Sequence, residues 1–377
     1  HIQSVRVSGQ WQAPLLTLQQ LDIDALQAQL HGDKIAITLG DALAVRGNIA
    51  LTVPGATART TGQLEPANGA GELQLKVDSA ERVQAWLQSL PGLASALNGT
   101  AIQGQAQLDA HWRGGLRSLQ QQLQSAQGQT SKTTPGDTPF TLQAALTTPH
   151  LNITPAPSDG KAATPIQLSR TKAELAGALT QATLALDVHA QLGTQRITLD
   201  SKISGGLATV GNAAAQWRAS VAALQLQWQD NNRPGTWALQ LQEPLAISAK
   251  SSAANTTLEA SGGQAQISAP VSGAAVLHWQ PLRLLQPAKG SAQLQTQGQL
   301  TGLPLAWVDA FTAPGEKSAL AAMGLAGDLL FNARWNVNAG ETLRASAVLE
   351  RASGDLRLLS GETATVTSVR SSGSQPK

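Results

Sequence analysis

The amino-acid sequence predicts an all-β, mostly antiparallel fold with a few short helices. Many short segments alternate apolar and polar residues with a period of two, as strands with one buried face do. Turn residues such as Gly205-Gly206 and Asn231-Asn232 separate these segments, so successive strands are expected to pair antiparallel. Strand and helix patterns do not alternate along the chain, which argues against a parallel α/β sheet.

The clearest alternation lies in the middle of the chain. Residues 182–192 place Leu184, Leu186 and Val188 on one face of a strand, and residues 223–229 do the same with Leu224, Leu226 and Trp228. The residues between them fall on the opposite face, and in the second segment these are Gln225 and Gln227. In chain order, the other predicted strands are 35–39, 49–53, 73–77, 196–203, 238–241, 257–267, 275–279, 292–300, 329–337, 342–350 and 355–359.

Helix signals are few. Val83, Trp86, Leu87 and Leu90 share one helical face, Asp78 or Ser79 can cap the helix, and Pro91 can end it, which predicts a helix over residues 80–90. A second short helix is predicted over residues 305–311, before Pro314. Residues 116–127 fit a helix or a strand equally well.

Composition excludes several classes of protein. The chain has 377 residues, 26 Lys and Arg against 24 Asp and Glu, and only 13% charged residues, too few positive charges for a nucleic-acid surface. With no cysteine, it has no disulfide framework, thiolate metal site or cysteine nucleophile. Apolar runs are too short for a membrane-spanning helix. Because the sequence starts at His1 without Met or a signal peptide, we expect a piece of a longer protein.

The domain organisation is expected to be simple. Residues 1–370 read as one elongated β segment, with possible sub-units 1–125 and 166–370 joined by a loop-rich region, 126–165. The tail 371–377 reads as disordered. Two stretches form a suggestive repeat, because each has a Trp-bearing helix followed by a strand that ends in Trp. These stretches contain Trp86 with Trp112, and Trp307 with Trp335.

No catalytic or metal-binding motif emerges, so the sequence predicts a non-enzymatic protein without a cofactor. The six histidines lack ligand spacing, and Asp22 with Asp24 has no supporting calcium loop. Nucleophile-elbow, phosphate-loop and dinucleotide motifs are missing from the sequence. A carbohydrate-active β-sandwich enzyme is an alternative, but it would need carboxylate pairs near tryptophan platforms.

The apolar face is dominated by Leu, Ala, Val and Ile, and the few predicted helices are too short to cover it. Two interpretations stay open: an ordinary β core, or a groove that receives acyl chains. The groove hypothesis has ten candidate residues: Leu184, Leu186, Val188, Leu224, Leu226, Trp228, Leu239, Leu241, Val276 and Leu294.

Several stretches together resemble one known family. They are residues 9–30, 77–92, 104–115, 215–242, 302–310 and 327–358, and they include the Ala326-Gly327-Asp328-Leu329 and Ser353-Gly354-Asp355-Leu356 motifs. Their order and the Trp-bearing helices resemble the middle of TamB-type members of the AsmA-like family of bacterial envelope proteins. The N-terminal anchor and C-terminal region of that family are not in this sequence.

The resemblance implies an elongated, curled sheet that forms an open hydrophobic groove, called a β-taco. It also implies a location in the periplasm of a Gram-negative bacterium, with anchoring in the inner membrane. The implied function is a conduit for phospholipid acyl chains, linked to outer-membrane biogenesis. The implied partners are flanking segments of the same chain and an outer-membrane TamA-like barrel protein. A structural adhesin or autotransporter-like β-solenoid is the alternative, which a regular rung length would favour.

Overall fold

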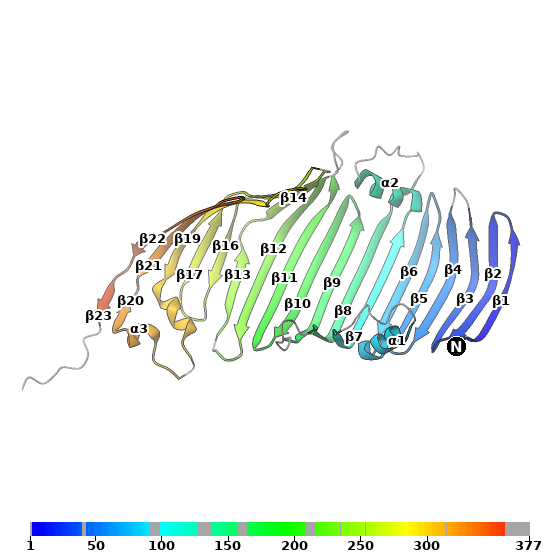
Figure 1. Ribbon diagram of the computed structural model, residues 1–377, viewed down its shortest axis with the longest axis horizontal. Coiled ribbons are helices and arrows are strands. Elements are labelled where there is room, and N and C mark those ends of the chain that lie inside the picture. Colours follow the sequence, from blue (N-terminus) through cyan, green and yellow to red (C-terminus); the bar gives the residue numbers. More distant parts are fainter. Residues whose placement is uncertain are drawn as a thin grey trace, which may run out of the picture.

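A computed structural model describes residues 2–39, 43–90, 99–126, 137–156, 164–208, 216–233, 235–252, 254–313 and 315–358. Their strands form one long antiparallel sheet of 21 strands, with β1 at one end and β22 at the other (Figure 1). A separate two-stranded sheet pairs β20 with β23. The prediction of a mostly antiparallel β fold is therefore confirmed.

The strands span most of the described chain. Their bounds are β1 Ile2–Gln12, β2 Leu15–Ala25, β3 Ala28–Thr38, β4 Ala44–Val53, β5 Ala56–Leu64, β6 Gly69–Val77, β7 Ala101–Arg113, β8 Thr141–Thr154, β9 Ile166–Ala178, β10 Gln181–Leu192, β11 Gln195–Ala208, β12 Gln216–Asp230, β13 Trp237–Leu241, β14 Leu245–Ser251, β15 Asn255–Ala260, β16 Gly263–Ser268, β17 Ala274–Trp279, β18 Leu282–Pro287, β19 Gln293–Pro304, β20 Leu325–Gly327, β21 Leu330–Ala339, β22 Leu343–Ser353 and β23 Leu356–Leu358.

From β1 to β12 each strand pairs with the next strand in the sequence, so this part of the sheet is a simple meander. β8 lies inside residues 126–165, the region predicted to be rich in loops. It pairs with β7 on one side and β9 on the other, so the sheet runs through this region without a break. The tail 371–377 lies outside the described residues.

Beyond β12 three successive strands are interrupted along one line across the sheet. β13 continues as β14, β15 as β16 and β17 as β18, with interruptions at residues 242–244, 261–262 and 280–281. Pro244 and Pro281 lie in two of these interruptions, where a residue without an N–H cannot extend the ladder. The prediction of one strand over residues 257–267 is wrong at this point.

The uninterrupted strands β12 and β19 each pair with both halves of a neighbouring interrupted strand and so hold the two halves of the sheet together. Because three pairs of strands are halves of interrupted strands, the 21 strands occupy 18 positions across the sheet. In Figure 1, β14, beyond the interruptions, is seen nearly edge-on, which shows that the sheet bends there.

The predicted helices are present. α1 covers Ala80–Ser89, and its N-cap Ser79 accepts a hydrogen bond from the backbone N–H of Arg82 at 3.3 Å. η1, a 3-10 helix, covers Leu305–Phe311, and a short helix α3, Ala319–Ala322, follows it. The undecided segment forms a helix, α2, over Leu116–Ala126. α1 and α2 lie at opposite ends of the strands (Figure 1).

Tertiary contacts explain why the ambiguous segment is helical. The first N–H groups of a helix have no partner within it. In α2, the N–H groups of Leu116 and Arg117 donate to the carbonyls of Glu65 and Pro66, in the turn between β5 and β6. An ion pair of 3.1 Å between Arg117 and Asp137 fixes the same end of the helix.

The two Trp-bearing repeat units share one structural detail. Trp112, at the end of β7, lies over Gly71 of the paired strand, and Trp335 of β21 lies over Gly298. Their helical tryptophans differ, because Trp307 is buried whereas Trp86 donates an exposed hydrogen bond to the carbonyl of Leu26 at 2.7 Å. The resemblance between the two units therefore holds for the strand more than for the helix.

The sheet has little closed core. About half of the buried apolar residues are alanines. Among the described residues, Leu207 is the largest side chain that is almost completely buried. The long aliphatic side chains of the central strands are half-buried. Most of the apolar face of the sheet is therefore in partial contact with solvent.

Candidate functional site

A row of apolar side chains crosses the whole sheet at right angles to the strands. Residues directly opposite each other on antiparallel strands have side chains on the same face. This apolar row has one residue at each of the 18 positions, and Ser201 is its one polar member. From β1 to β22 it consists of Val5, Ile23, Leu30, Leu51, Ala58, Leu75, Leu108, Leu146, Ala173, Leu186, Ser201, Leu224, Leu241, Ala265, Leu277, Leu300, Ala333 and Leu349.

Nine of the ten candidate residues lie on this face. Leu186, Leu224 and Leu241 belong to the apolar row itself. A parallel row joins Val188 through Leu199 to Leu226 and then to Leu239. Leu184 pairs with Ile203, Trp228 with Trp237, and Leu294 with Leu284. All nine side chains are half-buried.

Val276 is the exception. It pairs with Gln266 on one side and Thr301 on the other, and Gln266 pairs with Gln240 of the glutamine face. The side chain of Val276 therefore lies on the polar face of the sheet. Its neighbours Ala275 and Leu277 occupy the apolar face instead.

The apolar face is hollowed near the ends of β8 to β12. A cavity of about 430 Å³ has a floor of small residues, since Gly177, Ala182, Gly205 and Ala219 follow one another across four strands. Larger apolar side chains form its sides: Leu119, Phe140, Leu142, Leu175, Leu184, Ile203, Trp217 and Ile247. Of these residues, Leu184 is one of the ten groove candidates predicted from the sequence. Leu119 lies in the segment 116–127, which the sequence did not assign to a helix or a strand.

Aromatic side chains cover the other end of this face. Trp237 stacks on Trp228 at 6.4 Å between ring centroids and meets Trp307 of η1 edge-on at 5.3 Å. Phe311 lies 5.6 Å from Trp237. The indole N–H of Trp307 is buried without an acceptor among the described residues. This aromatic cluster packs η1 onto the sheet.

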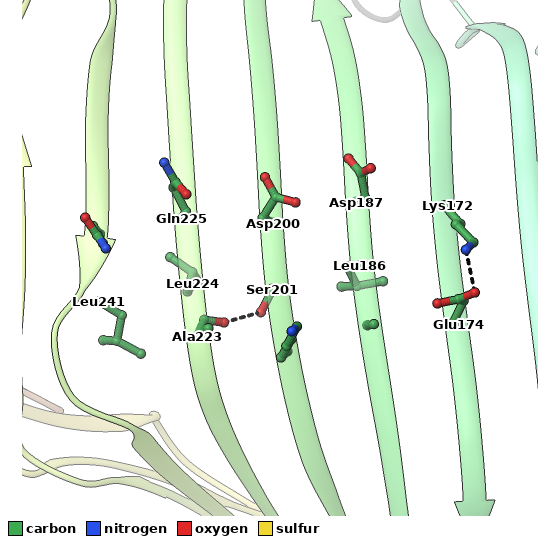
Figure 2. A pocket seen from close by; sticks show the side chains of 13 residues that line it. Lys172, Glu174, Leu186, Asp187, Asp200, Ser201, Ala223, Leu224, Gln225 and Leu241 are labelled. Carbon is green, nitrogen blue, oxygen red and sulfur yellow. Dashed lines mark hydrogen bonds and ion pairs between the residues drawn. The ribbon is translucent and has the colours of Figure 1, made fainter.

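The opposite face carries charges and amides. This face has a hollow of about 320 Å³. Lys172, Asp187, Asp200 and Gln225 lie side by side there on four successive strands (Figure 2). Lys172 pairs with Glu174 at 2.5 Å, and alanines between the charged residues form the floor of the hollow. Asp187 also pairs with His189 at 3.0 Å. These groups are partly exposed, so their ion pairs contribute little stability.

The polar residues considered from the sequence form local pairs. Asp22 binds His31 of the neighbouring strand at 2.5 Å, and His111 lies 3.8 Å from Glu72. The hydrogen bond from His31, with a second from Gln20, lowers the pKa of Asp22 below its ordinary value. Within the described ranges, no group of three or more metal-ligating side chains comes together.

Comparisons with protein-family models, with curated proteins and with solved structures find no match to this chain. In the part of the chain that the structure describes, none of the helices has the length and apolar character needed to cross a bilayer.

Proposed function

We propose that this chain is a non-enzymatic lipid conduit whose curled sheet forms an open groove for phospholipid acyl chains. The observation that carries the proposal is the apolar row, an aliphatic surface across 18 strand positions that only Ser201 interrupts. At about 4.8 Å between strands, this row extends for about 80 Å. Acyl chains lying on it would gain about 0.8 kcal/mol for each methylene removed from water.

Burial next to the interruptions supports the curled geometry. On the apolar face, Ala265 and Ala275 are at most 1% exposed, and Val221 is 6% exposed. On the polar side, Gln242 and Gln280 are exposed. A bend buries side chains on its inner side, so the apolar face is the concave one. α2 and η1 flank it at the strand ends and leave its middle accessible.

The groove is passive in this proposal. Headgroups project from the groove into water while the tails slide along Leu, Ile and Val side chains that offer no directional contact. The direction and the energy of transport come from other components. Following the resemblance, we place the chain in the periplasm of a Gram-negative bacterium, anchored to the inner membrane through a region that this sequence does not include. Its proposed partners are flanking segments of the same chain and an outer-membrane TamA-like barrel protein.

The alternative of an adhesin-like β-solenoid is less well supported. A β-solenoid coils so that its rungs pair in parallel. Every strand pairing in the described part of this chain is antiparallel. We therefore do not propose a solenoid function.

Photo-crosslinking in a Gram-negative host tests the conduit. A photoreactive residue replaces Leu184 or Leu226, on the apolar face, and Gln227, on the polar face, serves as the matched control. We expect phospholipid adducts by mass spectrometry at the two leucine positions and none at Gln227. Equal labelling at all three positions, or no phospholipid with the purified chain, would contradict the proposal.

A further inference from the structure

The cavity of about 430 Å³ on the apolar face lies at the ends of the strands next to α2. Leu119 of α2 and Phe140, just before β8, form part of its wall, and Trp217 of β12 forms another part. Its volume falls in the range of pockets that bind small molecules, about 300–1,000 Å³. Because its lining is mainly apolar, the part of a ligand that enters it must be apolar as well.

Arg218 also lines this cavity and places a positive charge at its rim. It is the third residue of β12, and its Nη2 atom donates a hydrogen bond of 3.2 Å to Oε1 of Gln216, the first residue of the strand. Since Gln216 is only 7% exposed, this bond holds the guanidinium toward the end of the strand. Arg218 is exposed, and a guanidinium has five N–H donors, so it can bind a further acceptor.

Three exposed bases at this end of the strands, Arg113, Arg218 and Lys250, form no ion pair with any described residue. The segments that connect the strands from β7 to β15 at this end contain a single acidic residue, Asp137. These segments are 114–140, 179–180, 209–215 and 252–254. Asp137 is already paired with Arg117 at 3.1 Å. The rim of the cavity is therefore positively charged and favours an anionic ligand.

Trp217 lies between the cavity and this charge. Its side chain lines the cavity, yet the residue is 47% exposed. Tryptophan is enriched where an apolar region meets water, because its ring is apolar and its indole N–H takes a polar partner. An apolar cavity, a tryptophan at its mouth and a base at its rim together match a molecule with an aliphatic tail and an anionic head.

We propose that this cavity binds one acyl chain of an anionic phospholipid and that Arg218 binds its phosphate. The inference rests on the proposed function and adds to it a discrete site and a preference for a negative headgroup. The acyl chain contacts Leu142, Leu184 and Trp217, and the phosphate accepts hydrogen bonds from the guanidinium. Such charge-assisted bonds are stronger than neutral ones, and the guanidinium fork fits a phosphate. A zwitterionic phospholipid gains less, because its own cation is repelled by the same rim.

Site-specific photo-crosslinking on the purified chain tests this site. A diazirine residue close to leucine in size replaces Leu184, which lines the cavity, or Leu226, which does not. The chain is incubated with vesicles of equal parts dioleoyl phosphatidylglycerol, which is anionic, and dioleoyl phosphatidylcholine, which is zwitterionic. Mass spectrometry then gives the ratio of the two lipid adducts at each position.

We expect phosphatidylglycerol adducts to exceed phosphatidylcholine adducts about fivefold at Leu184 and to equal them at Leu226. Arg218→Gln should bring the ratio at Leu184 close to one. Arg196→Gln is the matched control, because Arg196 is exposed on β11 at the other end of the strands, and it should leave the ratio unchanged. Both variants should melt like the unchanged chain, since both positions are exposed.

A second pair of variants tests the cavity itself. Ala219→Leu fills the cavity floor and should remove most adducts of both lipids at Leu184 while leaving those at Leu226. Ala185→Leu, on the opposite face, adds the same volume and should change neither.

Equal ratios at Leu184 and Leu226 in the unchanged chain, or an Arg218→Gln chain that keeps the preference, would overturn the headgroup site. Undiminished adducts at Leu184 in the Ala219→Leu chain would show that the acyl chain lies outside the cavity, and would overturn it too. Each of these outcomes leaves the conduit standing. An absence of adducts at both positions would contradict this inference and the proposed function together.

Discussion

The indole Nε1 of Trp279 donates a hydrogen bond of 3.0 Å to the backbone carbonyl of Ser261, at the line where three strands are interrupted. A side chain thus satisfies a carbonyl in one of the interruptions of the ladder. We expect Trp279→Phe to lower the free energy of unfolding by about 1 kcal/mol, because the carbonyl loses its partner. Urea unfolding measures the effect.

The control for this change is Trp217→Phe, since the N–H of Trp217 has no hydrogen-bond partner in the described part of the chain and the residue is 47% exposed. An equal loss of stability in both variants would show that ring size, and not the hydrogen bond, is responsible.

Gly263 makes room for the same tryptophan. A methyl group on Gly263 would lie 2.5 Å from Cζ2 of Trp279, and no other group is as close. We expect Gly263→Ala to cost about 1–3 kcal/mol, because the ring must move. In a Trp279→Ala background the same change should be neutral or slightly stabilising, as Gly→Ala reduces the entropy of the unfolded chain.

A double-mutant cycle by urea unfolding measures this coupling. Gly340→Ala is the control, because the nearest atom to its added methyl group is 3.6 Å away. Additive effects of the two changes would rule out the steric explanation.

Ser201, the polar member of the apolar row, stabilises a β-bulge. Its hydroxyl is buried and donates to the carbonyl of Ala223 at 3.1 Å, where β12 has its register shift against β11. Ser201→Ala should therefore cost about 1 kcal/mol in urea unfolding, since the carbonyl of Ala223 loses the hydroxyl that donates to it. The exposed Ser204→Ala should change stability by less than about 0.5 kcal/mol. Similar small effects at both positions would contradict this role.

Charge in the proposed groove should block transport without unfolding the protein. Leu226 is half-buried, so the guanidinium of Leu226→Arg can remain in water, and the melting temperature should stay close to that of the unchanged chain. Acyl chains would then meet a hydrated charge, and crosslinking of phospholipid beyond it should fall.

Gln227→Arg places the same charge on the opposite face and should affect neither measurement. If Leu226→Arg melts early and aggregates, the apolar face is a packed core and the conduit fails. If it folds and lipid still crosslinks along the whole chain, the groove is not the path.

The pair of Asp22 and His31 gives a pH dependence. Hydrogen bonds from His31 and Gln20 hold the pKa of Asp22 below its ordinary value in the folded chain. A lowered folded pKa favours folding above the ordinary pKa of aspartate, about 3.9, and this contribution is lost as pH falls through the folded value. In an NMR titration, His31→Ala should return the pKa of Asp22 toward its ordinary value. An unchanged titration would show that His31 is not the cause.

Local patterns in the sequence were sufficient for part of this fold. The alternation in residues 182–192 assigns Leu184, Leu186 and Val188 to one face, because a strand has only two faces. The helical spacing of Val83, Trp86 and Leu87 and the cap at Ser79 likewise predict α1 from neighbouring residues alone.

Alternation was insufficient where apolar residues follow one another. Ala275, Val276 and Leu277 are consecutive, so either phase gives an apolar face, and only the pairing with Gln266 places Val276 on the polar one. In β12, Val221 and Leu224 share a face although three positions separate them. The bulge at Ala222 shifts the phase between them, because Ile203 pairs with Val221 while Lys202 pairs with Ala223.

The sequence by itself determined that this chain forms strands with one aliphatic and one amide-rich face, because side-chain direction along a strand depends only on a period of two. The tertiary structure alone decided the register that aligns the aliphatic faces across 18 strand positions. It also decided the helix at Leu116–Ala126 and the interruptions at residues 242–244, 261–262 and 280–281. Each of these depends on hydrogen bonds between residues far apart in the chain, such as Leu116 with Glu65 and Trp279 with Ser261. A local pattern cannot specify such a partner, because register is a relation between two strands and not a property of either one.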